Sequence, residues 1–403
     1  MYPVTNSFLF ATGIENSYPT LRSGARIDQM EKCGHYARWE EDFALVRDMG
    51  LNALRYGPPY YRTHIAPDRY DWDWADAPMH RLRALGIEVI ADLCHFGVPG
   101  WLGGFQDDAF PVLFAEYARS FARRYPWVRY FTPVNEIFIC ANFSAMRGWW
   151  NECEKSDATF VRALRNLCMA HELAVEALLT ERPDAIIVQG ESIEHFHPAG
   201  LAAQKEADRW NGIKHLSLDL TLGHELAPGM AAYLHDHGVT SNDLSFFRER
   251  RGVGQRWLGM DYYPTCEHRV ASTGRRTTSR RAIGFRTLAT HYYRRYGIPV
   301  FHCETNRVDR HAVAWLDEQW RDIVHLRSIG IPVRGFTWYS LTDQVDWQHA
   351  LREERNDLHP VGLFDLDRRP RAVAHRYREL VATWGAAWAQ EDVAAGGQAL
   401  AEA

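Results

Sequence analysis

The sequence predicts an α/β protein built as a single (β/α)8 (TIM) barrel. Segments with the pattern of a buried strand alternate with segments of helical periodicity about eight times, and no linker or change of composition interrupts the series. The segment Ile87–His95 is almost continuously apolar, which is typical of parallel sheets that are covered on both faces. Polar residues stand at the carboxyl ends of the strands, where a barrel of this class carries its active site.

The strands are expected where short apolar or β-branched runs end in polar or turn-forming residues. In chain order they are Ser7–Gly13, Leu51–Tyr56, Ile87–His95, Tyr130–Glu136, Ala185–Gly190, Trp257–Tyr263, Val300–Glu304 and Val333–Leu341.

The helices are expected where apolar residues recur every three to four positions and a glycine or proline follows. The first shows the pattern well, because Trp39, Phe43 and Val46 share one face and Gly50 ends the run. In chain order the helices are His35–Met49, Asp76–Leu85, Phe110–Tyr125, Thr159–Thr180, Arg281–Tyr296, His311–Arg327 and Ala372–Trp384. We interpret the irregular span from Glu191 to Gln255 as one barrel helix with inserted loops.

The barrel is expected to occupy residues 1–388, and the Ala/Gly-rich residues 389–403 are expected to form a disordered tail. A hydrophobic content of 46% in 403 residues is enough for a large core, and a net charge of −5 gives no basic surface for nucleic acid or anionic lipid. The N-terminus lacks the layout of a signal peptide, and no apolar run reaches membrane-spanning length.

Neither a disulfide framework nor a metal site is indicated. The seven cysteines are odd in number and scattered, which fits reduced thiols and a cytoplasmic location. His195 and His197 and the run Asp71–Trp74 lack the ligand spacing of a zinc or calcium site, so we interpret them as loop residues. We expect no metal and no cofactor.

Two strands end in a glutamate, Glu136 and Glu304. Either residue alone is explained by a structural ion pair. In one barrel, however, both would reach the same rim, and paired carboxyls are the equipment of glycoside hydrolysis. Further polar residues are expected at this rim: Arg55, His95, Asn135, Asp261, Tyr263 and the region Tyr339–Trp347.

With these residues assembled, the chain resembles glycoside hydrolase family 1, the β-glucosidase family, from about Phe8 to Tyr377. The family's acid/base motif T-x-N-E-P is similar to Thr132–Glu136, and its nucleophile motif I-T-E-N-G is similar to His302–Asn306. Its sugar-binding W-S-L-x-D-N-x-E-W is similar to Tyr339–Trp347. Other stretches resemble its motifs in the same order: Phe8–Gly13, Trp39–Tyr56, His95–Leu102, Gly259–Tyr263 and Gly362–Asp367.

The resemblance implies a role for each site residue. Glu304 would be the nucleophile and Glu136 the general acid and base, with their carboxyls about 5–5.5 Å apart. Arg55 and Tyr263 would keep Glu304 ionised. The remaining residues would contact the sugar: Asn135 at the 2-hydroxyl, His95 and Asp346 at other hydroxyls, and Trp338 and Trp347 at the ring.

The sequence also departs from the family. Glu15 and Asn16 leave the sugar-binding glutamine without a counterpart, Asp346 replaces a glutamate, and Tyr339 takes a tryptophan position. We therefore expect a retaining, exo-acting β-glycosidase that hydrolyses a terminal β-linked sugar of a small glycoside or oligosaccharide. A transglycosylase or a glycosidase for an unusual sugar is the alternative, and a non-catalytic sugar-binding barrel is a third. The sugar, the linkage and the oligomeric state stay open.

Overall fold

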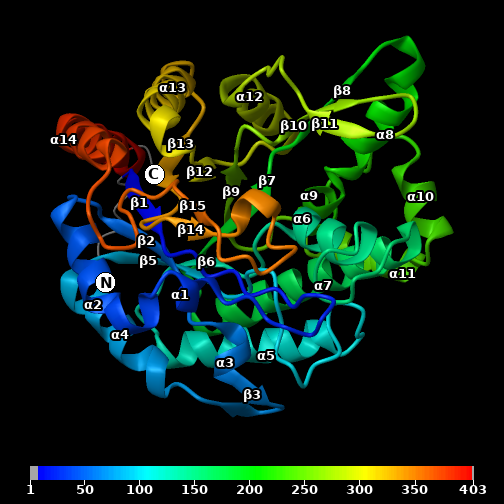
Figure 1. Cartoon of the computed structure of the whole chain (residues 1–403), viewed down its shortest axis with the longest axis horizontal. Coiled ribbons are helices and arrows are strands. Elements are labelled where there is room, and N and C mark those ends of the chain that lie inside the picture. The colour runs from blue at the N-terminus through cyan, green and yellow to red at the C-terminus, as the bar shows by residue number, and fades with distance from the viewer. Residues whose placement is uncertain (1–7, 402–403) are drawn as a thin grey trace.

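The chain folds into a closed barrel of eight parallel strands surrounded by helices, as the sequence predicts (Figure 1). The computed structural model describes residues 8–401, so the start of the first expected strand and the last two residues of the expected tail lie outside it. The strands follow one another around the barrel in the order β1-β13-β12-β9-β7-β6-β5-β2. Their bounds are β1 Leu9–Gly13, β2 Ala53–Tyr56, β5 Glu88–Asp92, β6 Tyr130–Thr132, β7 Ile186–Ser192, β9 Gln255–Asp261, β12 Val300–Glu304 and β13 Val333–Trp338.

The outer ring contains every helix that the sequence predicts. Its main helices are α2 His35–Asp48, α4 Asp73–Leu85, α5 Phe110–Arg124, α7 Asp157–Glu181, α12 Phe285–Tyr296, α13 Asp309–Ser328 and α14 Ala372–Ala401. The last of these has a helical backbone to Ala401, so it extends through most of residues 389–403, for which the sequence predicts a disordered tail. Runs rich in alanine favour helix, which gives the physical reason.

The irregular span after β7 contains more structure than one helix with loops. Four short helices occupy it: α8 Gln204–Ile213, α9 Leu216–Thr221, α10 Met230–Asp236 and α11 Ser241–Glu249. A three-stranded sheet of β8 His195–Pro198, β10 Glu267–Val270 and β11 Arg276–Thr278 joins this span to the segment that follows β9. Most of this insertion lies to one side of the barrel (Figure 1).

Shorter elements complete the chain in the other loops. They are α1 Gln29–Lys32, α3 Tyr60–Thr63, β3 His64–Ala66, β4 Arg69–Tyr70, α6 Ile137–Ala141, the π-helical turn η1 Asn142–Met146, the 3-10 turns η2 Leu201–Ala203 and η3 Trp347–His349, β14 Gln344–Val345 and β15 Leu358–His359.

The barrel interior is apolar at its centre and polar at the carboxyl end of the strands. The buried cluster inside it consists of Leu9, Ala11, Ala53, Ile90, Tyr130, Ile186, Val188, Phe301 and Cys303. Because side chains alternate along a strand, the residue two positions after an inward one also points inward. On β2 the inward Ala53 is followed in this way by Arg55, and on β5 the inward Ile90 is followed by Asp92. Two charged side chains therefore lie on top of the apolar centre.

Helix α14 lies beside β1, so the last helix and the first strand are neighbours in the fold (Figure 1). The Trp388 ring lies 4.4 Å from the Phe8 ring and 5.2 Å from the Trp320 ring, measured between centroids, and Trp388 is buried. Aromatic contacts of this kind bury a large apolar area at the amino end of the barrel. Within residues 8–401, no helix has the length and apolarity that crossing a membrane requires.

Candidate active site

A cavity of about 620 Å³ opens among the loops that follow the barrel strands. Of the nine residues to which the resemblance gives a role, five line it: His95, Glu136, Tyr263, Glu304 and Trp347. Four do not: Arg55, Asn135, Trp338 and Asp346. The structure therefore brings both glutamates to one cavity and divides the nominated residues into those at its surface and those behind it.

Glu304 is held by two groups at the end of β12. The Tyr263 hydroxyl donates a hydrogen bond to its Oε2 at 2.7 Å, and the Arg55 guanidinium forms an ion pair with its Oε1. The pairing of β12 with β9 shifts register between His302 and Glu304, and an irregularity of this kind re-aims a strand's side chain. A cation and a hydrogen-bond donor both stabilise the ionised carboxylate.

Arg55 is almost fully buried and connects Glu304 to the residues beneath it. Its Nη2 lies 3.0 Å from Asp92 Oδ2 and also donates to Asn135 Oδ1. Burial alone would raise the pKa of Asp92, but Arg55 and His95 beside it bring that pKa below its usual value. Asp92 is therefore a buried anion that compensates part of the Arg55 charge.

Asn135 and His95 form the next layer of this network. Asn135 Nδ2 donates to His95 Nε2 at 3.1 Å, and His95 Nδ1 lies 2.7 Å from Asp92 Oδ2. The amide of Asn135 is thus bonded at both ends, and Asn135 is fully buried. This placement differs from the expected sugar contact and makes Asn135 a residue that orients Arg55 and His95.

Glu136 lies at the turn that leads from β6 into α6. Its φ of 41° is in the left-handed region, which L-residues seldom adopt, and its backbone N–H donates to the Gly190 carbonyl of β7 at 3.0 Å. A residue held in such a conformation is typical of a functional site, since the surrounding fold has to hold it there.

Burial and acidic neighbours act in the same direction on the pKa of Glu136. Burial raises the pKa of Glu136 well above its usual value, and the charges of Asp261, Glu191 and Glu194 raise it further, against an opposing effect of Arg55. Burial also raises the pKa of Asp261 to about 7 and that of Glu191 to about 8. A carboxyl in such surroundings can donate a proton near neutral pH.

Glu191 is a residue of this site that the sequence analysis did not nominate. Its carboxylate accepts hydrogen bonds from the Phe138 and Ser192 backbone and from the Ser217 hydroxyl. It therefore ties the start of α6, directly after Glu136, to β7. The signal that could have identified it is the apolar run Ala185–Val188, which ends in polar residues as the Glu136 and Glu304 strands do.

One part of the cavity wall is built from Tyr339, Glu15 and Gln344. Tyr339 packs directly on Gly13, where a Cβ would lie 2.3 Å from the ring, so only glycine fits there. Gln344 Nε2 donates to Glu15 Oε2 at 3.1 Å. Of these three, Glu15 and Tyr339 were noted in the sequence as departures from the family pattern.

Trp338 and Asp346, for which sugar contacts are expected, are not among the residues that line the cavity. The fully buried Trp338 donates from its indole nitrogen to the Val361 carbonyl at 2.9 Å. The Asp346 carboxylate accepts three backbone hydrogen bonds from consecutive residues, Arg355 to Asp357, at 2.8–3.1 Å. Both residues hold the loop after β13 in shape, and Trp347, which follows Asp346 directly, lines the cavity.

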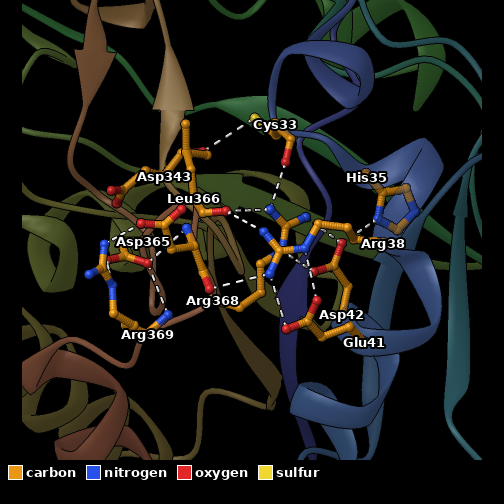
Figure 2. Close-up of polar contacts among 11 residues, drawn as sticks. Cys33, His35, Arg38, Glu41, Asp42, Asp343, Asp365, Leu366, Arg368 and Arg369 are labelled. Atoms are coloured by element: carbon orange, nitrogen blue, oxygen red, sulfur yellow. Dashed lines mark hydrogen bonds and ion pairs between the residues drawn. The ribbon is translucent and has the colours of Figure 1, made fainter.

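A buried polar network attaches that loop to α2 (Figure 2). Arg368 donates to both carboxylate oxygens of Asp42 at 2.8 and 3.0 Å, and His35 lies 2.7 Å from Asp42 on its other side. The Cys33 thiol donates to the Asp343 carbonyl at 3.2 Å. Gln344 and Trp347 therefore belong to a segment fixed at both ends.

The two carboxyls of the cavity lie in different surroundings. Glu304 contacts a guanidinium and a hydroxyl donor, whereas burial and acidic neighbours raise the pKa of Glu136. Among residues 8–401, no group of three or more His, Cys, Asp or Glu side chains is placed to hold a metal ion, and His197 instead pairs with Glu267 at 2.8 Å. The arrangement can supply a nucleophile and a proton donor to one bond.

Comparisons with known proteins agree with this geometry. The family model for Glycosyl hydrolase family 1 matches residues 24–224. A β-glucosidase of Agrobacterium sp. is 24% identical over 79% of this chain and 78% of its own length. The 6-phospho-β-glucosidase AscB of Escherichia coli is 23% identical over 83% of this chain and 80% of its own length. A solved β-glucosidase from Thermotoga maritima, in complex with a methoxycarbonyl-substituted glucoimidazole, superposes with a TM-score of 0.79 over 94% of this chain and 98% of that one, at 17% identity.

Proposed function

The chain belongs to glycosyl hydrolase family 1 and is a glycoside hydrolase, and from that premise we propose that it is a retaining β-glycosidase that removes a terminal β-linked sugar. The observation that carries the proposal is that one cavity contains both Glu304 and Glu136. Glu304 contacts Arg55 and Tyr263, and Glu136 has a raised pKa.

In the first step the Glu304 carboxylate attacks the anomeric carbon as Glu136 protonates the leaving oxygen. The bond to the leaving group breaks, a covalent glycosyl-enzyme forms at Glu304, and Glu136 becomes a carboxylate. Arg55 and Tyr263 hold the attacking carboxylate in place. Because the Glu304 charge is consumed when the ester forms, Glu136 is then easier to ionise.

In the second step Glu136 acts as a base. It removes a proton from water, the water oxygen attacks the anomeric carbon, and the Glu304 carboxylate leaves. Two displacements at the same carbon restore its original configuration. Asn135 serves both steps indirectly, because it positions Arg55 and His95.

The first test is turnover of a panel of aryl β-glycosides by the wild type and by Glu304→Ala. We expect the wild type to hydrolyse at least one glycoside and the variant to lose roughly four orders of magnitude or more in kcat, as nucleophile removal does in other covalent catalysts. Glu318→Ala, on the exposed surface of α13, is the control and should keep wild-type activity. Normal turnover by Glu304→Ala would contradict the assignment.

Added azide, as an external nucleophile, tests whether the reaction retains the configuration at the anomeric carbon. In Glu304→Ala, azide would attack the anomeric carbon from the vacated side and give an α-glycosyl azide from a β-glycoside. In Glu136→Ala, azide would attack the glycosyl-enzyme and give the β-glycosyl azide. The same product from both variants would exclude the proposed division of roles.

A glycosidase for an unusual sugar is the second candidate. Glu15 places a carboxylate at the cavity wall, and Asp346 is fully engaged by backbone N–H groups, so neither position supplies the family's pattern of hydroxyl contacts. Turnover of a panel of aryl β-glycosides decides between the two candidates. The panel includes glucoside, galactoside, fucoside, mannoside, xyloside and 6-phosphoglucoside. Products formed with an added alcohol would reveal transglycosylation.

We also propose a cytoplasmic location. All seven cysteines are buried and carry free thiols, so residues 8–401 contain no disulfide bond. Unpaired thiols suit a reducing compartment. Fractionation of the source cells, followed by an activity assay, tests this proposal.

A further inference from the structure

The cavity carries unpaired positive charge at its walls, although the whole chain is acidic with a net charge of −5. Four arginines line it: Arg147, Arg307, Arg310 and Arg352. In the described part of the chain, residues 8–401, none of these four has a carboxylate within ion-pair distance. Local positive charge of this kind attracts anionic ligands.

Two of these arginines converge on one indole ring. The Arg147 guanidinium carbon lies 4.7 Å from the centroid of Trp149, and that of Arg352 lies 4.8 Å from the same centroid. Arg147 comes directly after η1, whereas Arg352 follows η3, so two loops contribute the pair. The loops also join directly, because the Trp150 indole nitrogen donates to the Ala350 carbonyl at 2.9 Å.

The two guanidiniums are close enough to repel each other. Burial lowers the pKa of Arg147, Arg352 lowers it further, and Glu194 offsets part of this effect. Glu194 also lies 3.1 Å from His268, so its charge is shared. In addition, Arg147 Nε is buried and has no hydrogen-bond partner in the described residues. An anion bound at these guanidiniums would relieve the repulsion and accept a hydrogen bond from Arg147 Nε.

Arg147 shares its surroundings with the proton donor. Both Glu136 and Arg147 line the cavity, the charge of Glu194 acts on both, and the segment from Glu136 through α6 and η1 leads directly to Arg147. Glu136 has to contact the oxygen of the leaving group in order to protonate it. The part of the substrate that Arg147 would meet is therefore the leaving group.

We propose that Arg147 and Arg352 bind an anionic group on the leaving-group part of the substrate, with Trp149 holding the two guanidiniums in place. The inference rests on the proposed function, since only a glycosidase has a leaving group to recognise. It adds a substrate class: β-glycosides whose aglycone carries a carboxylate or a similarly charged group.

The test compares a 4-carboxyphenyl β-glycoside with its methyl ester, built on the sugar that the wild type hydrolyses fastest or, if it hydrolyses none, on glucose. The two differ in charge but little in shape. We expect the wild type to favour the acid by about tenfold in kcat/KM, and the preference to shrink as sodium chloride is added. Arg147→Gln and Arg352→Gln should each reduce the acid-to-ester ratio toward one. Arg355→Gln, an exposed arginine that pairs with Glu353 and does not line the cavity, should keep the wild-type ratio.

Equal kcat/KM for acid and ester in the wild type would overturn the inference, and so would a preference that survives both substitutions. Calorimetric binding of the same two glycosides to Glu304→Ala separates this outcome from a failure of the proposed function. Tighter binding of the acid that depends on Arg147, without turnover by the wild type, would support the anion site and reject the glycosidase. Neither turnover nor preferential binding would reject both.

Discussion

At the scale of single residues, protonation is decided by neighbours that are distant in the sequence. Glu304 ends β12 and Glu136 lies in the turn after β6, and both line the same cavity. Glu304 is paired with Arg55, whereas Asp261, Glu191 and Glu194 act on Glu136. An opposite charge favours the ionised form and like charges disfavour it. The same residue type therefore acquires two different roles.

Replacing Asp261 with Asn should shift the pH dependence of activity. The raised pKa of Glu136 means that the acid form persists to higher pH than an ordinary carboxyl, and activity falls as pH rises through that pKa. Because Asp261 contributes to the rise, its removal should lower the pKa of Glu136. The alkaline limb of kcat/KM should then move to lower pH, which a pH–rate profile measures.

Glu88→Gln provides the control for this prediction, because Glu88 starts β5 at the opposite end of the barrel. Its profile should coincide with that of the wild type. An alkaline limb that is unchanged in Asp261→Asn would show that Asp261 does not act on the proton donor.

At the scale of elements, the loop after β13 depends on contacts that it makes with α2. Arg368 is buried and bonds to both oxygens of Asp42, and this pair is itself braced by His35 (Figure 2). A charge removed from a buried pair leaves its partner uncompensated. The position of Gln344 and Trp347 at the cavity is thus tied to a helix at the start of the chain.

Replacing Arg368 with Met should destabilise the fold by about 3–5 kcal/mol, because Asp42 would remain as a buried, unpaired charge. Chemical denaturation monitored by tryptophan fluorescence measures the change. Arg369→Met is the matched control: this neighbour is exposed and pairs with Asp365 at the surface, where an ion pair contributes about 0–1 kcal/mol. Equal effects of the two substitutions would refute the role of the network.

At the scale of the whole molecule, the chain closes on itself at the amino end of the barrel. Trp388 of α14 packs on Phe8 and Phe10 beside β1 and on Trp320 of α13, so the last helix covers the first strand. We propose that the catalytic domain ends at residue 388 and that residues 389–403 are dispensable for its stability.

Two truncations test this boundary. A chain that ends at Gln390 should keep the thermal midpoint and activity of the full chain. A chain that ends at Ala386 loses Trp388 and should be destabilised by about 3–5 kcal/mol, as expected for a large buried aromatic. Differential scanning fluorimetry measures both. A large loss of stability on truncation at Gln390 would move the boundary toward the C-terminus.

Local sequence patterns were sufficient to predict the alternation of strands and helices, the eightfold barrel and the presence of Glu136 and Glu304 at its rim. These features follow from periodicity, because a parallel barrel brings all strand ends to one face whatever the loops do. The irregular span after β7 was underestimated, since the pairing of β8 with β10 joins residues about 70 positions apart and leaves no local period.

Which rim residues reach the cavity depends on tertiary contacts that no local pattern reveals. Trp338 and Asp346 fit a sugar-contact motif, yet the Val361 carbonyl and the backbone after Glu354 engage them, and their side chains serve the loop. Glu191 and the convergence of Arg147 with Arg352 on Trp149 likewise depend on contacts between separate loops. A strand's period determines to which face a side chain points, but loop packing determines what it meets there.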